Sequence, residues 1–148
     1  MQNSSSIKSL SPEQTLEIAG QLAGQFPKAL VLLHGELGAG KTLFARGFAA
    51  GLGIDDHVSS PSYTLMNEYR GAGQSMFHLD LYRINCFEEV IDIGLFDILK
   101  AGQPCLIEWA ERVAELDRLP HLNVRITLCA GDSEEHRQVS WQWQEGQS

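Results

Sequence analysis

Long apolar segments are missing from this chain of 148 residues. No apolar run approaches the roughly 20 residues that a helix needs to span a membrane. The start, residues 1–6, is polar and contains no apolar core of a signal peptide. We therefore expect a protein without a membrane segment, located in the cytoplasm.

Cysteine is scarce as well. Cys86, Cys105 and Cys129 lie far apart in the sequence, and no C-x-x-C pair occurs. This spacing excludes the patterns that are typical of a zinc site or a disulfide framework. The three side chains are predicted to be buried thiols in a reducing compartment.

Basic charge is also in short supply, because 11 Lys and Arg residues oppose 19 Asp and Glu residues and leave a net charge of −8 at pH 7. A protein that binds nucleic acid on its own usually presents a basic face. The acidic balance disfavours that class, although a local basic patch stays compatible with it. The guanine-reading motif N-K-x-D is absent too, which disfavours a switch-type GTPase.

The remaining composition is that of a soluble globular protein, with 43% hydrophobic and 20% charged residues. At this length the chain can bury a core of its own, so we expect one domain over residues 1–148. No internal repeat and no low-complexity linker divides it.

One motif organises the chain. Residues 35–42 read G-E-L-G-A-G-K-T and fit G-x-x-x-x-G-K-(S/T), the phosphate-binding P-loop. Residues 29–33 before it form an apolar run of buried-strand length, and apolar residues recur at helical spacing after it. The motif therefore stands between a predicted strand and a predicted helix, which is the context that gives it meaning.

The chemistry of phosphate binding explains the spacing. Gly38 and Gly40 lack a Cβ, so the backbone can curl and bring its N–H groups close to an anion. The following helix N-terminus favours negative charge. Lys41 is expected to reach the β- and γ-phosphates of ATP, and the Thr42 hydroxyl is expected to bind Mg²⁺. The predicted nucleotide-binding residues are Gly35, Glu36, Leu37, Gly38, Ala39, Gly40, Lys41, Thr42 and Leu43.

Strand-like and helix-like segments alternate around this motif. A helix is predicted from the cap Ser11, hairpins at residues 65–81 and 122–143, a helix at 87–99, a strand at 104–109 and a short helix at 111–119. A short strand is expected at residues 7–10. The pattern predicts an α/β fold of the P-loop NTPase-like three-layer type, with a mainly parallel central sheet and antiparallel edge strands.

Two carboxylates follow predicted strands and are the candidates for catalysis. Glu108 follows an apolar strand, which favours it as the Mg²⁺-side carboxylate, and Asp80 then becomes the group that orients water. The reverse assignment stays open. The catalytic candidates are Lys41, Asp80 and Glu108, and the metal candidates are Thr42 and Glu108.

Several neighbouring residues have less specific interpretations. Arg83 and Arg112 follow the two carboxylates and are candidates for stabilising phosphate, with surface ion pairing as the commoner role. His78 is predicted to be a core or hydrogen-bonded histidine, and Tyr82 and Trp109 to be packing residues or part of a partner surface. For the hydroxyl-rich turn at residues 58–65, a phosphate-facing switch and an ordinary strand entry are equally compatible with the composition.

Four segments together resemble one family. They are residues 35–42, S-P-S-Y-T-L at 60–65, H-L-D-L-Y-R at 78–83 and I-E-W-A-E-R at 107–112. In order and spacing they are similar to TsaE, a P-loop ATPase family of bacterial tRNA threonylcarbamoyladenosine biosynthesis. The resemblance covers residues 11–112, and Ser62 stands where the family often has Thr.

This resemblance implies an ATPase that uses ATP and Mg²⁺ but does not itself modify RNA. It implies two protein partners, TsaD and TsaB, which transfer the threonylcarbamoyl group to the adenosine beside the tRNA anticodon. Contact with tRNA would then be indirect, through the complex, which is compatible with the acidic net charge.

Two other classes remain as alternatives. A small-molecule kinase of the P-loop class usually needs an arginine-rich lid, but the arginines here are scattered along the chain. A nucleotide-gated binding module, whose hydrolysis is incidental, is the second alternative. Phosphate release with and without partners and small acceptors distinguishes these classes.

Overall fold

The computed structural model describes residues 4–36, 38–62, 64–129, 131 and 133–146. The strands are β1 Ser4–Ser9, β2 Leu30–Gly35, β3 Met66–Gly71, β4 Gln74–Asp80, β5 Cys105–Glu108, β6 His121–Leu128 and β7 Arg137–Gln144. The helices are α1 Pro12–Gln25, α2 Lys41–Gly51, α3 Phe87–Ile93 and α4 Leu95–Lys100, followed by the 3₁₀ turns η1 Ala110–Arg112 and η2 Ala114–Arg118.

The strands form one mixed sheet in the order β1-β7-β6-β2-β5-β4-β3 within the described residues. Strands β6, β2, β5 and β4 run parallel at its centre. The pairs β1–β7, β6–β7 and β3–β4 are antiparallel. The α/β class, the parallel centre and the antiparallel edges are therefore confirmed, as are both predicted hairpins.

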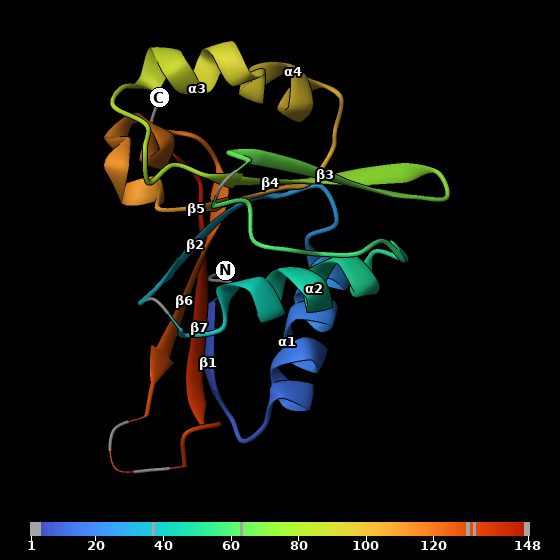
Figure 1. Ribbon diagram of the computed structural model, residues 1–148, viewed down its shortest axis with the longest axis vertical. Coiled ribbons are helices and arrows are strands. Elements are labelled where there is room, and N and C mark those ends of the chain that lie inside the picture. Colours follow the sequence, from blue (N-terminus) through green and yellow to red (C-terminus); the bar gives the residue numbers. More distant parts are fainter. Residues whose placement is uncertain (1–3, 37, 63, 130, 132, 147–148) are drawn as a thin grey trace.

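Helices pack against both faces of this sheet, as Figure 1 shows for α2 and for α3 with α4 on opposite sides of β4. Alternation along β2 explains the two cores, because successive side chains of a strand point to opposite faces. Val31 and Leu33 belong to the core that contains α1 and α2. Leu30 and Leu32 belong to the core that contains α3, α4 and the 3₁₀ turns.

Helix α1 begins as its sequence predicts. The Ser11 side chain accepts a hydrogen bond from the Gln14 N–H at 3.2 Å, and Pro12 occupies the first turn. The Gln14 side chain in turn accepts from the Leu10 N–H at 2.7 Å. The first bond satisfies a donor that the start of a helix otherwise leaves unpaired, and the second joins the residue before the cap to the first turn.

Helices α1 and α2 lie very close together, and glycine permits this. A Cβ placed on Gly47 would lie 2.6 Å from the Leu16 carbonyl oxygen, and one on Gly51 would lie 2.5 Å from that of Gly20. No side chain fits into either gap. The backbone of α2, the helix that follows the glycine-rich loop, is thereby held against α1.

Two predicted helices differ from the observed ones. The stretch 87–99 is two short helices, because Gly94 adopts φ 108° between them and ends α3 in a left-handed conformation. The stretch 111–119 is not an α-helix but two 3₁₀ turns, because Val113 is extended between them. The early strand begins at Ser4, before the predicted residue 7, because it pairs with β7 along its whole length.

The prediction of three buried thiols is wrong for two of them. Cys105 is buried in β5, whereas Cys86 is exposed at the start of α3 and Cys129 is half-buried after β6. Burial raises the pKa of the Cys105 thiol far above its ordinary value. Among the residues described above, no helix is long and apolar enough to cross a membrane.

Candidate functional site

A cavity of about 260 Å³, lined mostly by polar and charged residues, lies where the central parallel strands end. It is bounded by the loop between β2 and α2, by the turn before β3 and by the last residues of β4 and β5. Such crevices at the carboxyl ends of parallel strands are the usual binding sites of open α/β sheets. Its lining residues are Gly38, Gly40, Lys41, Thr42, Ser60, Ser62, Asp80, Glu108 and Trp109.

The glycine-rich loop needs its glycines. Gly38 and Gly40 have φ values of 84° and 104°, in the left-handed region where a Cβ is strained. A Cβ on Gly35 would lie 2.9 Å from the Ile126 carbonyl oxygen of the neighbouring strand. Gly40 caps α2 without any side-chain hydrogen bond, so the cap residue leaves the first N–H groups of that helix free for a ligand.

The predicted nucleotide-binding residues divide into two groups. Gly38, Gly40, Lys41 and Thr42 line the cavity. Gly35, Glu36, Ala39 and Leu43 adjoin them in the loop and in the first turn of α2, where the Glu36 carbonyl accepts from the Ala39 N–H at 3.0 Å. Leu37 lies outside the described residues.

The sheet brings the two carboxylates together. Asp80 and Glu108 end neighbouring parallel strands and are register partners. Both are buried, with 6% and 4% of their surfaces exposed. A buried carboxylate needs a partner, and Nζ of Lys41 lies 3.8 Å from Oε1 of Glu108. The same nitrogen lies 4.8 Å from the centre of the Trp109 ring.

A chain of hydrogen bonds orients Glu108 from behind. Its Oε2 lies 2.7 Å from Nε2 of the fully buried His78, as the prediction of a hydrogen-bonded core histidine requires. Nδ1 of His78 lies 3.3 Å from the Tyr69 hydroxyl, which donates to the Ser59 carbonyl at 2.6 Å. Burial raises the pKa of Tyr69, so it stays a neutral donor.

The hydroxyl-rich turn lies against Asp80. Ser62 Oγ donates to Oδ2 of Asp80 at 3.2 Å, and the Ser60 and Ser62 hydroxyls are 2.8 Å apart. The Tyr82 N–H donates to the other carboxylate oxygen at 2.9 Å. This geometry favours a turn that faces the cavity over an ordinary strand entry. Tyr63 lies outside the described residues.

Backbone strain marks both walls of the cavity. Leu65 and Trp109 have φ values of 71° and 60°, which non-glycine residues adopt at an energetic cost. The Leu65 carbonyl accepts the Asp80 N–H at 3.0 Å, and Trp109 directly follows Glu108. Both strained residues therefore adjoin a site carboxylate, which is where such strain commonly serves a function.

The arginines and aromatic residues lie around the rim. Arg83 donates to the Ser62 carbonyl at 2.7 Å, and Arg112 stacks 5.8 Å from the centre of the Tyr82 ring. Neither contact is the surface ion pair that the sequence favoured. Tyr82 is 58% exposed rather than packed in the core, and its ring meets the half-buried Trp109 edge-on at 5.0 Å.

Sequence reasoning missed Arg137. This residue begins β7, and its Nε donates to the Ala39 carbonyl of the glycine-rich loop at 2.9 Å. The two residues are 98 positions apart, and the bond goes to a main-chain oxygen. No local sequence pattern predicts such a contact. It depends on the pairing of β2 with β6, because β6 and β7 form the hairpin that places Arg137 beside the loop.

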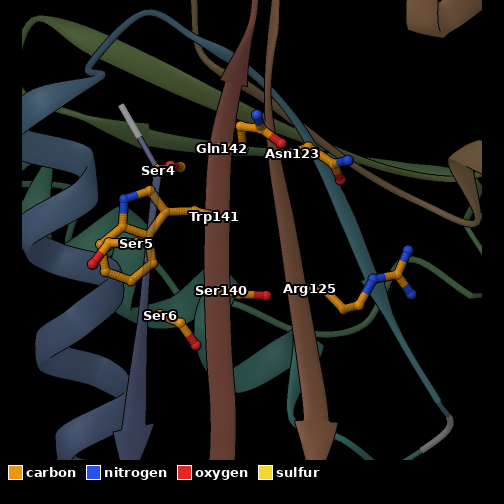
Figure 2. Close-up of a pocket in the computed structure, with 8 residues that line it drawn as sticks. All are labelled: Ser4, Ser5, Ser6, Asn123, Arg125, Ser140, Trp141 and Gln142. Carbon is orange, nitrogen blue, oxygen red and sulfur yellow. The ribbon is translucent and has the colours of Figure 1, made fainter. Parts of the chain in front are cut away.

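A larger cavity, of about 490 Å³, lies on the sheet portion formed by β1, β7 and β6. Figure 2 shows Arg125 and Asn123 extending from β6, away from the Trp141 ring. The described residues that line this larger cavity are mostly serines and amides, and none of them is a carboxylate. Volume alone therefore does not identify the site; the chemistry gathers in the smaller cavity.

The fold and the smaller cavity define a class, namely α/β proteins whose polar site lies between a glycine-rich loop and the carboxyl ends of parallel strands. The family model described as "Threonylcarbamoyl adenosine biosynthesis protein TsaE" matches residues 9–139. The chain belongs to the TsaE family, which confirms the resemblance noted in the sequence.

Individual relatives agree with this assignment. The chain is 39% identical over 130 residues to tRNA threonylcarbamoyladenosine biosynthesis protein TsaE of Bacillus subtilis (strain 168), covering 86% of this chain and 79% of that protein. It is 42% identical over 100 residues to the protein of that name from Treponema pallidum (strain Nichols), covering 68% and 72%. The crystal structure of Bacillus subtilis YdiB superposes with a TM-score of 0.73 at 32% identity, covering 97% of this chain and 87% of that one.

Proposed function

We propose that this protein binds and hydrolyses ATP in support of tRNA threonylcarbamoyladenosine biosynthesis, on a P-loop NTPase-like three-layer fold. One observation carries the proposal. Lys41, Thr42, Asp80 and Glu108 come from three separate segments and line one cavity above the N-terminus of α2. A cation, a hydroxyl and two carboxylates beside a curled glycine-rich backbone are the groups that phosphoryl transfer to water requires.

The loop and Lys41 bind the phosphates in this proposal. The first N–H groups of α2 and the Gly40 N–H supply donors at the positive end of a helix dipole. Lys41 is held near the cavity by Glu108 at 3.8 Å and exchanges this carboxylate for the β- and γ-phosphates. Because the pair is buried, the competing attraction of water for Lys41 is small.

The donor set fits Mg²⁺. The described cavity lining presents the hydroxyl of Thr42 and the carboxylate of Glu108, which are oxygen ligands of the kind this cation prefers. Magnesium beside phosphates usually takes only one or two carboxylates, and among the described residues no group of three or more His, Cys, Asp or Glu forms a metal cluster. When bound, Mg²⁺ would neutralise charge on the phosphates.

Asp80 is proposed to orient the attacking water. Its carboxylate lies in the cavity and already accepts hydrogen bonds from Ser62 and from the Tyr82 N–H. This position lets Asp80 accept a hydrogen bond from water while Glu108 stays bonded to His78. The reverse assignment of the two carboxylates is tested by comparing their amide variants.

The biological role follows the family. The relatives are named for tRNA threonylcarbamoyladenosine biosynthesis, and we propose the same process for this chain, in the cytoplasm. We further propose that it acts with TsaD and TsaB and reaches tRNA only through them. Hydrolysis by the isolated chain is then slow, because Lys41 is the only cation among the described residues that line the cavity, and a full charge clamp on the transferring phosphate usually needs more.

The decisive experiment is titration calorimetry with ATP and Mg²⁺, together with phosphate release, for wild type and Lys41→Ala. Wild type is expected to bind, and the variant is expected to keep its fold, bind ATP weakly and lose hydrolysis. Exposed Lys100→Ala, in the last turn of α4, is the control and is expected to behave as wild type. Unchanged ATP affinity in Lys41→Ala would show that Lys41 does not bind the phosphates. Phosphorylation of a small acceptor would favour a kinase. A nucleotide-gated binding module would bind its partners equally well without hydrolysis.

A further inference from the structure

The guanidinium of Arg137 donates its hydrogen bonds to main-chain carbonyl oxygens. Nε donates to the Ala39 carbonyl at 2.9 Å and Nη2 to the Gly38 carbonyl at 3.4 Å, both in the glycine-rich loop. Nη1 donates to the carbonyls of His136 at 2.9 Å and of Glu134, in the turn before β7. Within the described residues it forms no ion pair with a carboxylate. One guanidinium therefore joins this turn to the loop.

The contact fixes the direction of a peptide group. A trans peptide is planar, so its C=O and N–H point in opposite directions, and the chain contains no cis bond among the described residues. When the Ala39 carbonyl faces Arg137, the N–H of Gly40 faces away from it. Gly40 lines the cavity, and its N–H has no hydrogen-bond partner in the described part of the chain.

The loop needs an outside restraint of this kind. Gly38 and Gly40 are both in left-handed conformations, and glycine has the largest conformational freedom to lose. The guanidinium is a rigid planar fork that stays charged at all ordinary pH values. A cation on the carbonyl also polarises the peptide and makes its N–H a stronger donor.

We propose that Arg137 is a positioning residue for nucleotide binding, which holds the Ala39–Gly40 peptide so that the Gly40 N–H faces the phosphates. This inference rests on the proposed ATP-binding function. It assigns a role to the β6–β7 hairpin, which otherwise only extends the sheet. Arg137 itself touches no reacting atom.

The test compares Arg137→Gln and Arg137→Lys with Arg125→Gln, which removes an exposed arginine from β6 of the same hairpin. Calorimetry with ATP and Mg²⁺ measures affinity, steady-state hydrolysis with the TsaD–TsaB pair separates KM from kcat, and thermal melts without nucleotide report stability. We expect Arg137→Gln to weaken ATP binding by at least about tenfold, the loss typical of a charge-assisted hydrogen bond. KM should rise with kcat nearly unchanged, whereas Arg125→Gln should match wild type.

Arg137→Lys keeps the charge but can reach fewer carbonyls, so its affinity should lie between the two. Millimolar guanidinium should partly restore ATP binding to Arg137→Ala, and equal concentrations of urea should not. If Arg137→Gln fails to fold, Arg137→Lys decides the matter, and wild-type affinity in that variant overturns the inference. Failure of the wild type to bind ATP would instead overturn the proposed function, so the two failures are distinguishable.

Discussion

Glu108 carries two contacts that pull on its carboxylate from opposite sides, Lys41 from the cavity and His78 from the core. A buried charge of this kind is tolerated only because both partners are present, and removing one partner of a buried pair is typically costly. The same burial makes the oxygen positions precise. A ligand that must bind a small, hard cation benefits from that precision.

Glu108→Gln tests the proposed role of Glu108 as a Mg²⁺ ligand, because it replaces one carboxylate oxygen by an amide nitrogen. The amide keeps the shape but is a poorer ligand for Mg²⁺, so metal-dependent ATP binding or hydrolysis is expected to fall by about tenfold or more, on the scale of a lost charge-assisted contact. Titration of Mg²⁺ at fixed ATP measures the change. Asp80→Asn is the comparison, since it should lower hydrolysis with little effect on the Mg²⁺ titration. A normal titration and normal turnover in Glu108→Gln would transfer the metal role to Asp80.

His34, at the end of β2, gives a pH-dependent prediction. Burial lowers its pKa, and this outweighs the opposing attraction of Glu111, whose Oε1 lies 3.5 Å from Nδ1. The unfolded chain therefore binds a proton at His34 more readily than the folded protein does. This part of the stability is present above the unfolded value of 6.5 and is lost as the pH falls through it toward the folded pKa.

Urea unfolding at about pH 7.5 and about pH 5.5 measures this linkage. Wild type is expected to lose more stability on acidification than His34→Gln, which cannot take up the proton. Glu111→Gln removes an attraction that raises the His34 pKa, so it should enlarge the loss. Equal losses in wild type and His34→Gln would show that His34 is not responsible.

At the scale of elements, the contact between α1 and α2 sets the position of the glycine-rich loop. Because a Cβ on Gly47 would lie 2.8 Å from the Leu16 Cα and 2.9 Å from the Ala19 Cβ, Gly47→Ala must push the helices apart. Overpacking of this kind typically costs about 1–3 kcal/mol.

Gly24→Ala is the matched control for Gly47→Ala. Gly24 lies in α1 with open space where a Cβ would be, so the substitution should stabilise the helix by up to about 1 kcal/mol. Thermal and urea denaturation of both variants measure the difference. Destabilisation of Gly24→Ala, or a neutral Gly47→Ala, would contradict the packing argument.

Elements with a strong local signal were predictable. A short stretch of sequence is enough to predict three kinds of feature: the cap at Ser11, the apolar runs of β2 and β5, and the turns of both hairpins. Gly94 weakens the middle of the helix predicted at 87–99, because glycine is a poor helix former. The break itself was not predictable, because packing on both sides decides whether a glycine becomes left-handed. The 3₁₀ turns at 110–118 depend on the strained Trp109 before them, which the sequence does not reveal.

The site divides in the same way. Asp80 and Glu108 were predicted because each ends a predicted strand, and parallel neighbours bring such ends together. Their alignment as register partners, and the bonds from His78 and Arg137, depend on pairings between distant segments. Reactive side chains that directly follow a strand can therefore be predicted from sequence, whereas the hydrogen bonds that hold them from distant segments cannot.

At the scale of the whole molecule, the open cavity and the exposed Tyr82 leave room for partners to act. Ser62, Arg83 and Asp80 link the turn to the site, so a protein that contacts the turn can alter how Asp80 is held. Order imposed on such a segment by a partner is a common route to activation in nucleotide-hydrolysing proteins.

Single-turnover hydrolysis with and without the TsaD–TsaB pair tests this dependence. The isolated wild type is expected to be slow and to accelerate by at least about tenfold; completion of a transition-state clamp by an arginine is worth roughly 10³–10⁵-fold in related reactions. Asp80→Ala should bind ATP nearly normally but lose the acceleration. Exposed Asp92→Ala on α3 is the control. Full-speed hydrolysis by the isolated wild type, or normal acceleration of Asp80→Ala, would refute the corresponding half of the prediction.

The order of strands in the sheet has a consequence for synthesis on the ribosome. Strand β1 pairs with β7, and Ser6 and Gln138, which bond across that pair, are 132 positions apart. The segment that forms β1 leaves the ribosome early but has no partner until β7 has been made. At elongation rates of about 5–20 residues per second, this strand waits for roughly 7 to 26 seconds. Its serine-rich composition, S-S-S-I-K-S, keeps an unpaired strand hydrated during that interval.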